Sequence, residues 1–226
     1  MTSLHAARSG AAAPPPARRR LSSGTRRGVL AVGILALVVA MALNTRVVRD
    51  GSAEDTRPRA FSAAEFGAAE FPAVKAAIEQ RAVEADVLAS AIATDATAAA
   101  AEYGVRSGVG SVIPVKFTGV VTTGKSGVYT VTVEGVPDAL VLRVQTGPAI
   151  NGTELRDATG TIGFDRFTNQ IEYQNAAAAL NNELKTQVLS ALGGIDLAGK
   201  TITVVGAFTL INPKAWLVTP VSMAVQ

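Results

Sequence analysis

The chain has 226 residues, which suits one folded domain with appended segments. It has no cysteine and one histidine, His5, which excludes disulfides, thiolate catalysis and cysteine or histidine metal sites from the rest of the chain. Residues 1–50 hold eight of the 21 basic side chains and one of the 18 acidic ones, so residues 51–226 carry a net charge of about −4. A nucleic-acid partner would require a basic face, so none is predicted, and no metal or other cofactor is expected.

The N-terminal part predicts a membrane protein. Residues 1–27 are rich in Ala, Pro and Arg and are predicted to form a disordered cytoplasmic tail. Gly28–Leu43 is an uninterrupted apolar run, so residues 28–45 are predicted to be a transmembrane signal anchor in the cytoplasmic membrane. As a helix the run spans about 24 Å, which is short of the roughly 30 Å hydrocarbon core. Because positive charge is densest before the run, we expect a single-pass protein whose C-terminal domain is extracytoplasmic.

Two other interpretations of the apolar run stay open. The small residues in Ala40–Ala42 would also suit a signal peptide that is cleaved after Ala42. Thr25–Leu30 resembles a twin-arginine export signal, although the ordinary positive charge of a signal segment accounts for Arg26 and Arg27 more simply.

The next residues predict a linker and the start of a helix. Residues 46–61 are polar and charged for most of their length and are interpreted as the linker. Ser62 and Glu65 have the spacing of a capping box, and Pro72 suits the first turn of a helix.

A helical segment is predicted over residues 62–104. Apolar residues recur every three or four positions from Val74 to Ile92, which is typical of a helix with one apolar face. The alanine-rich stretch Asp95–Tyr103 continues or restarts this helix, and Gly104 ends it. We expect the apolar face to pack against the following domain.

Residues 112–226 predict a small β domain, since the apolar period changes to two after a Gly- and Ser-rich break at 107–111. The expected elements are strands Val115–Thr122, Gly127–Glu134 and Ala139–Gln145, helix Asn175–Leu192, and strands Lys200–Leu210 and Trp216–Val225. Pro220 is interpreted as a mark of an edge strand. The fold class is therefore α+β, with an OB-like β-barrel that has a helix between its third and fourth strands. An open α+β sheet with the helix on one face is the alternative.

Gly119–Ser126 matches the P-loop pattern letter for letter. Phosphate binding by that motif requires a helix that starts at its Lys-Ser, but a clear strand pattern begins at Gly127. A hairpin with a turn at Thr123–Ser126 is therefore expected, and no nucleotide partner is predicted.

The stretch Gly147–Tyr173 concentrates polar side chains among apolar anchors. Its candidate ligand-binding residues are Asn151, Arg156, Asp157, Asn169 and Gln170, which could line a pocket for a hydroxyl-rich ligand. The same side chains could instead satisfy the backbone of a long irregular loop, and this second interpretation is favoured. Asp157 and Asp165 would be the carboxylates of a glycosidase-like site, but nothing in the sequence sets their separation.

These segments carry a family resemblance. GPAINGTELRDATG and FDRFTNQIEYQ, followed by Leu197–Lys200 and Thr219–Val221, resemble the bacterial domain-of-unknown-function family 2291, described as predicted periplasmic lipoproteins. The resemblance runs from about Arg57 to the C-terminus. It implies an extracytoplasmic domain associated with sugar ABC transport and no established catalytic residue. The lipid-bearing cysteine expected after the apolar run is absent, because Asn44-Thr45 stands there, so the helix itself would be the anchor.

The functional prediction is a non-catalytic binding or accessory module, not an enzyme, at the outer face of the membrane. Its predicted partners are the cytoplasmic membrane, through Gly28–Leu43, and either ABC-transporter components or a small sugar. A structural or assembly factor of the cell envelope is the alternative, and a carboxylate-based hydrolase is a third hypothesis.

Overall fold

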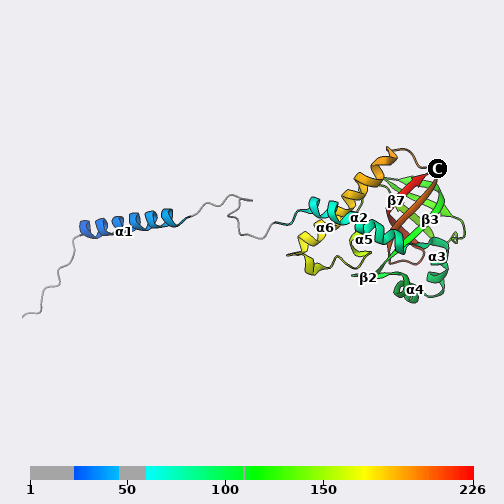
Figure 1. Cartoon of the computed structure of the whole chain (residues 1–226), viewed down its shortest axis with the longest axis horizontal. Coiled ribbons are helices and arrows are strands. Elements are labelled where there is room, and N and C mark those ends of the chain that lie inside the picture. Colours follow the sequence, from blue (N-terminus) through cyan, green and yellow to red (C-terminus); the bar gives the residue numbers. More distant parts are fainter. Residues whose placement is uncertain (1–22, 46–59, 109) are drawn as a thin grey trace, which may run out of the picture. The chain divides into compact units, whose positions relative to one another are not determined.

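The computed structural model describes residues 23–45, 60–108 and 110–226 (Figure 1). Most of the predicted tail, residues 1–27, and most of the predicted linker, residues 46–61, lie outside these ranges. The chain divides into two units, Met1–Arg59 and Ala60–Gln226. Each unit is described by itself below.

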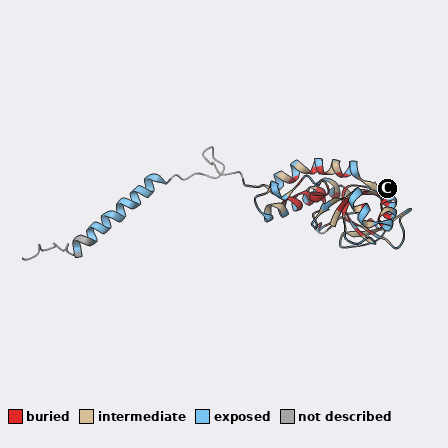
Figure 2. Cartoon of the chain, turned by 90° about the horizontal axis from the view of Figure 1, so that it is seen from below, coloured by how far each residue is buried: buried red, intermediate tan, exposed pale blue. Residues whose placement is uncertain are grey.

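The first unit contains one helix, α1 (Ser23–Asn44), within the described residues. Its 22 residues span about 33 Å, so the helix is longer than the apolar run alone and reaches the thickness of a hydrocarbon core. The window Arg27–Asn44 has a mean hydropathy of 2.0 and is long and apolar enough to cross a membrane. Its side chains are exposed (Figure 2). A signal sequence near the N-terminus passes the same test of length and composition.

The second unit begins with helix α2 (Ala63–Arg81). Ser62 is its N-cap, and the Ser62 hydroxyl accepts a 3.3 Å hydrogen bond from the backbone N–H of Glu65, as the capping spacing predicts. Pro72 lies inside α2, so the prediction that it occupies the first turn is wrong. The cap at Ser62, ten residues earlier, begins the helix instead.

The expected helical segment is broken rather than continuous. After α2 come strand β1 (Val83–Glu84) and helices α3 (Ala85–Thr94) and α4 (Ala96–Tyr103). The break occurs because β1 pairs in parallel with Val115 and Lys116 of strand β3 (Gly110–Lys125), where Glu84 and Lys116 form a 3.2 Å ion pair. Asp95 then caps α4 by accepting hydrogen bonds from two backbone N–H groups. The pairing of β1 with β3, which is distant in the chain, therefore interrupts a segment whose apolar spacing predicts one helix.

Five of the described strands pair in a ring. β3 pairs with β4 (Val128–Val133), β4 with β5 (Val141–Gln145), β5 with β7 (Ala215–Val225), β7 with β6 (Thr201–Leu210), and β6 again with β3. A short strand, β2 (Val105–Ser107), pairs with β3 outside this ring.

The long strand β3 closes the pairing because it changes partner along its length. Residues from Ser111 to Val120 pair with β6, and residues from Gly119 to Lys125 pair with β4. Gly119 pairs on both sides, and a Cβ there would collide with the Thr132 carbonyl oxygen, so only glycine permits this close approach.

The P-loop-like segment is a hairpin. β3 runs through Lys125, and Ser126 and Gly127 form a two-residue turn with φ angles of 55° and 76° before β4 begins at Val128. The turn is two residues later than predicted, because strand pairing continues to the Lys125–Val128 pair. The segment contains no helix start at Lys125-Ser126.

β7 is not an edge strand, so that prediction is wrong. Residues Ala215–Val218 pair with β5, and residues from Thr219 onward pair with β6. Pro220 is tolerated because it lies beyond the β5 pairs and beside the register shift at Val205/Gly206.

The strands separate two apolar clusters. The first fills the interior of the ring, where Phe208 and Trp216 stack at 4.5 Å, and Leu88 and Ile92 of α3 join it. The second lies on the outer face of β3, β6 and β7, under α2 and helix α6 (Gln170–Leu184). Its members include Val112, Ala207, Val221, Phe71, Ile78, Leu180 and Leu184. Both faces of these strands are therefore buried.

α6 begins five residues before its predicted start at Asn175. It continues through a π turn, Lys185–Leu189, and a 3-10 turn, Ser190–Leu192, and then ends at Gly193 with a φ of 59°. In the chain it follows β5 and precedes β6.

Candidate functional site

The predicted polar stretch folds around a short helix, α5 (Glu154–Asp157), which the sequence did not reveal. Arg156 and Asp157 are both buried there and form an ion pair with two hydrogen bonds. Arg156 Nε lies 2.7 Å from Asp157 Oδ1, and Arg156 Nη2 lies 3.1 Å from Asp157 Oδ2. Two predicted ligand-binding residues thus bind each other.

Arg156 and Asp157 also form hydrogen bonds to other groups of the domain. Asp157 Oδ2 accepts 2.7 Å hydrogen bonds from the hydroxyls of Ser107 and Thr153. Arg156 donates to the Tyr173 carbonyl oxygen at 3.0 Å, and its guanidinium lies 3.5 Å from the centre of the Tyr173 ring. The pair therefore joins β2, α5 and α6, which is the structural role favoured for this stretch.

The other three candidate residues, Asn151, Asn169 and Gln170, are exposed. Asn169 is the N-cap of α6 and accepts a 2.9 Å hydrogen bond from the backbone N–H of Glu172. Gln170 is the first residue of that helix. The five candidates form one buried pair and three surface residues, and their ligand binding stays a prediction.

A second polar network lies beside the pair and was missed. The carboxylate of Glu154 accepts hydrogen bonds from Thr209 Oγ1 at 3.1 Å and from Thr219 Oγ1 at 3.4 Å, and Gln145 donates to Thr219 at 2.9 Å. Burial raises the pKa of Glu154 above its usual value, the negative charge of Asp157 adds to the rise, and the threonine hydrogen bonds oppose it. Glu154 gave no signal in the sequence because its partners are 55 and 65 residues away.

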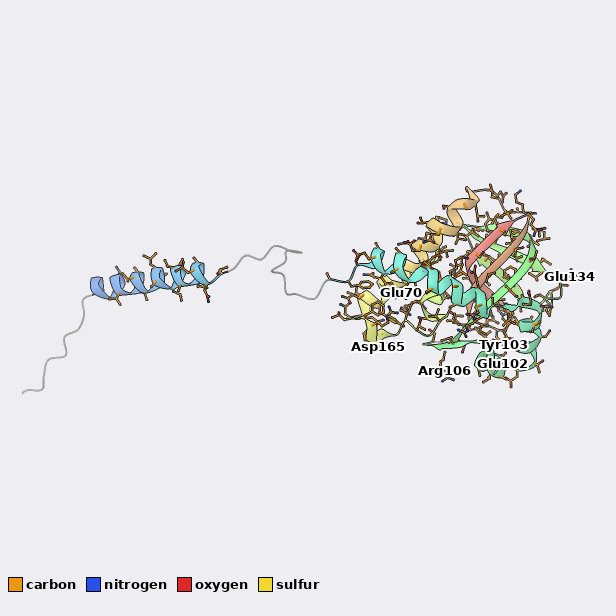
Figure 3. The ribbon with its side chains drawn as sticks, viewed as in Figure 1. Glu70, Glu102, Tyr103, Arg106, Glu134 and Asp165 are labelled. Carbon is orange, nitrogen blue, oxygen red and sulfur yellow. The ribbon has the colours of Figure 1, made fainter. Side chains whose placement is uncertain are left out.

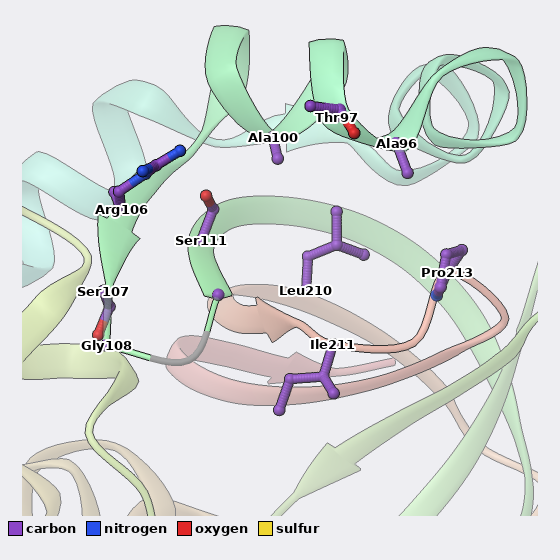
Figure 4. A pocket seen from close by; sticks show the side chains of 11 residues that line it. Ala96, Thr97, Ala100, Arg106, Ser107, Gly108, Ser111, Leu210, Ile211 and Pro213 are labelled. Carbon is purple, nitrogen blue, oxygen red and sulfur yellow. The ribbon is translucent and has the colours of Figure 1, made fainter.

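A pocket of about 370 Å³ lies under α4, and we refer to it as the α4 pocket (Figure 4). Arg106 of β2 is paired with Ser111 of β3, and Ser111 is paired on its other side with Leu210 of β6. Directly opposed residues of antiparallel strands place their side chains on one face, so the three side chains form a row. The complete lining is Ala96, Thr97, Ala100, Arg106, Ser107, Gly108, Gly110, Ser111, Leu210, Ile211 and Pro213.

The polar groups of this row are available to a ligand. Arg106 is exposed at the outer edge of the domain (Figure 3). Among the residues that the structure describes, no hydrogen bond or ion pair holds the Arg106 guanidinium or the hydroxyls of Thr97 and Ser111. Arg106 is also the single charged side chain of the lining. The pocket therefore has one cationic end.

Sequence reasoning missed this pocket because Arg106 lies next to the Gly- and Ser-rich break. Strand β2 has three residues, which is too short for a period-two pattern to be recognised. The sequence showed a single arginine, Arg106, between two predicted elements. Its role in a pocket could be recognised only once the structure placed β3 and β6 beside it.

A second pocket, of about 290 Å³, has no charged side chain in its lining. It lies between the β3–β4 turn and the segment after α6, and Tyr129, Leu189, Leu192, Ile195 and Leu197 are among its lining residues. The described residues contain no group of three His, Cys, Asp or Glu side chains that could hold a metal ion.

A family model described as predicted periplasmic lipoprotein matches residues 33–224, which is most of the chain. The chain belongs to DUF2291. Membership of DUF2291 and the apolar helix α1 together indicate a membrane-anchored extracytoplasmic protein. This DUF2291 member has no cysteine to carry a lipid.

The fold of the DUF2291 domain has a solved neighbour. It is similar to the crystal structure of an OB-fold protein from Thermotoga maritima, with a TM-score of 0.59 and 19% identity over 74% of this chain and 100% of that chain. The likeness supports an OB-type α+β fold and carries no information on function. No curated protein is similar enough to the chain to count as a relative.

Proposed function

We propose that this DUF2291 domain is a non-catalytic binding module at the outer face of the cytoplasmic membrane, and that it binds a small molecule in the α4 pocket. One observation carries the proposal. The row Arg106–Ser111–Leu210 presents a cation, a hydroxyl and an apolar side chain to one pocket, and its polar groups have no partner among the described residues. Ligand pockets commonly combine apolar walls with a few such polar groups.

The use of the carboxylates favours binding over hydrolysis. A glycosidase requires two free carboxyl groups that face each other across the substrate. Asp157 is paired with Arg156 and accepts two further hydrogen bonds, whereas Asp165 is exposed on the 3-10 turn Phe164–Arg166 (Figure 3). The hydrolase hypothesis therefore lacks a catalytic pair at these positions.

The link to sugar transport is a proposal from family resemblance. If it is right, a sugar or polyol should bind the domain, or a transporter component should bind it instead. Assembly of the cell envelope is the alternative role, and it predicts no stabilisation by small molecules.

A thermal-shift screen of the full chain in phosphatidylcholine nanodiscs tests the binding role. The compounds are sugars, polyols and small organic acids and amides. A ligand at a hundred times its dissociation constant should stabilise the domain by about 2.7 kcal/mol. If no compound raises the melting temperature, the binding module is wrong and the assembly role is favoured.

We further propose that α1 is a single-pass anchor with its N-terminus in the cytoplasm. The positive charge before the apolar run supports this orientation. Protease added to spheroplasts should digest the domain and spare the N-terminal tail. A soluble mature chain that begins at Leu43 would show instead that the segment is a cleaved signal peptide.

A further inference from the structure

We infer that the α4 pocket binds a small organic monocarboxylate, with Arg106 as the ion-pair partner of its carboxylate. The inference rests on the proposed binding function and names the class of ligand. It follows from the order of side chains across three strands and from the charge of the lining.

The pocket changes in polarity along the row. Arg106 lies at one end, Ser111 in the middle and Leu210 at the other end, because the three residues are register partners on β2, β3 and β6. Pro213 lies beyond Leu210 in the loop after β6 (Figure 4). A ligand that fits this order has an anionic group at one end and an apolar part of a few carbon atoms at the other.

The charge of the lining selects a monoanion. Arg106 is the single charged side chain among the eleven lining residues, and no acid lies with it to oppose an anion. A guanidinium offers parallel N–H donors that match the two oxygens of a carboxylate. A phosphate dianion would meet one cation only, whereas a neutral sugar would leave the guanidinium without a charged partner.

Helix α4 determines the room for the carbon chain. It covers the row with Ala96, Thr97 and Ala100, and these small side chains leave the space that larger ones would fill (Figure 4). The Thr97 hydroxyl supplies a donor beside the row, and the Ser111 hydroxyl supplies one within it. The volume of about 370 Å³ suits a small ligand.

The strand that carries Arg106 is fixed by a contact on its other face. Ser107, the neighbour of Arg106 on β2, donates a 2.7 Å hydrogen bond to the buried Asp157. Adjacent strand residues point to opposite faces, so this contact anchors β2 on one face while Arg106 lies on the other. A strand that is already fixed loses little backbone entropy when a ligand binds.

Isothermal titration calorimetry of the full chain in phosphatidylcholine nanodiscs tests the inference. The probes are butyrate, its neutral analogue butyramide, inorganic phosphate and glucose. We expect butyrate to bind. Butyramide and glucose should bind at least about tenfold more weakly, because neither has a charge to pair with Arg106. Phosphate should also bind at least about tenfold more weakly, because it has no apolar part to contact Leu210 and its second charge meets no cation. Arg106→Gln should weaken butyrate binding by at least about tenfold, because the carboxylate then has no charge to pair with.

Matched variants separate the site from general effects. Lys125→Gln removes the same charge from the exposed C-terminal end of β3 and should leave butyrate binding unchanged. Ala100→Leu fills the pocket and should abolish binding. Ala98→Leu changes an exposed residue of the same helix outside the lining and should not. Melting temperatures of all four variants report whether each one folds.

The outcomes distinguish this inference from the proposed function. Equal binding of butyrate and butyramide, or binding of glucose alone, would overturn the monocarboxylate and leave a binding module. Unchanged butyrate affinity in Arg106→Gln would overturn the role of Arg106. If none of these probes binds and the wider screen also finds no ligand, both proposals are wrong.

Discussion

The hydroxyl of Ser107 donates a 2.7 Å hydrogen bond to Oδ2 of Asp157, and this contact joins strand β2 to helix α5. The same carboxylate pairs with Arg156, which in turn binds the Tyr173 carbonyl of α6. Arg156 and Asp157, two of the five residues predicted to contact a ligand, thus hold the strand that carries Arg106. Arg156 and Asp157 would therefore affect ligand binding by positioning β2, without contacting the ligand themselves.

We predict that Asp157→Asn destabilises the domain by about 3–5 kcal/mol, since it leaves Arg156 as a buried and unpaired charge. Chemical denaturation monitored by circular dichroism measures the loss. Asp165→Asn is the control, because Asp165 is exposed, and it should change the free energy of unfolding by less than about 0.5 kcal/mol.

The double variant Arg156→Met/Asp157→Asn sharpens this prediction. Removal of both charges should cost less than removal of Asp157 alone, because no unpaired ion remains buried. A double variant that is less stable than Asp157→Asn would contradict the account of the pair.

The raised pKa of Glu154 predicts a pH dependence of stability. Burial raises this pKa above its usual value of 4.5, so the folded domain holds a proton that the unfolded chain releases. The stability from this group is fully present below pH 4.5 and is lost as the pH rises through the folded pKa. Denaturation of the wild type across this range measures the fall.

Glu154→Gln keeps a neutral group at this position and should remove that part of the fall. Glu134→Gln changes an exposed acid of the segment after β4 and should leave the pH profile as in the wild type. If the Glu154→Gln and wild-type profiles are parallel, Glu154 does not titrate with the shift described here.

Gly127 and Gly199 have nearly the same backbone φ, but we expect an alanine substitution to destabilise the domain by different amounts at the two positions. Gly127 has a φ of 76° and Gly199 a φ of 75°. A Cβ on Gly127 would collide with the Gly147 carbonyl oxygen, whereas a Cβ on Gly199 would meet nothing within 4 Å. We expect Gly199→Ala to cost about 1 kcal/mol from strain alone and Gly127→Ala about 3 kcal/mol or more. Equal urea midpoints for the two variants would contradict the close approach of Gly127 to the Gly147 carbonyl group.

Neighbouring residues of α3 test its packing against the ring interior. Leu88 is fully buried, and Leu88→Ala should cost about 2–5 kcal/mol by leaving a cavity. Val87 is 50% exposed, and Val87→Ala should cost less than about 0.5 kcal/mol. Thermal unfolding followed by calorimetry compares the two, and a Leu88→Ala loss under about 1 kcal/mol would contradict this packing.

The candidate site shows where sequence reasoning stops. The stretch Gly147–Tyr173 could be recognised as unusually polar, but its two interpretations differ only in what Arg156 and Asp157 contact. Those contacts depend on Ser107 and Tyr173, which are 50 and 17 residues away from their partners. Arg106 likewise can be recognised as a pocket residue only because strand register aligns it with Ser111 and Leu210.

The sequence by itself determined the apolar helix α1, the family, the cap at Ser62 and the period-two strands, because each depends on residues close together in the chain. The tertiary structure alone decided the break between α2 and α3, the double pairing of β7 and the α4 pocket. Each of these arises from pairing with β3, β5 or β6, and a hydrogen bond between distant strands leaves no local pattern.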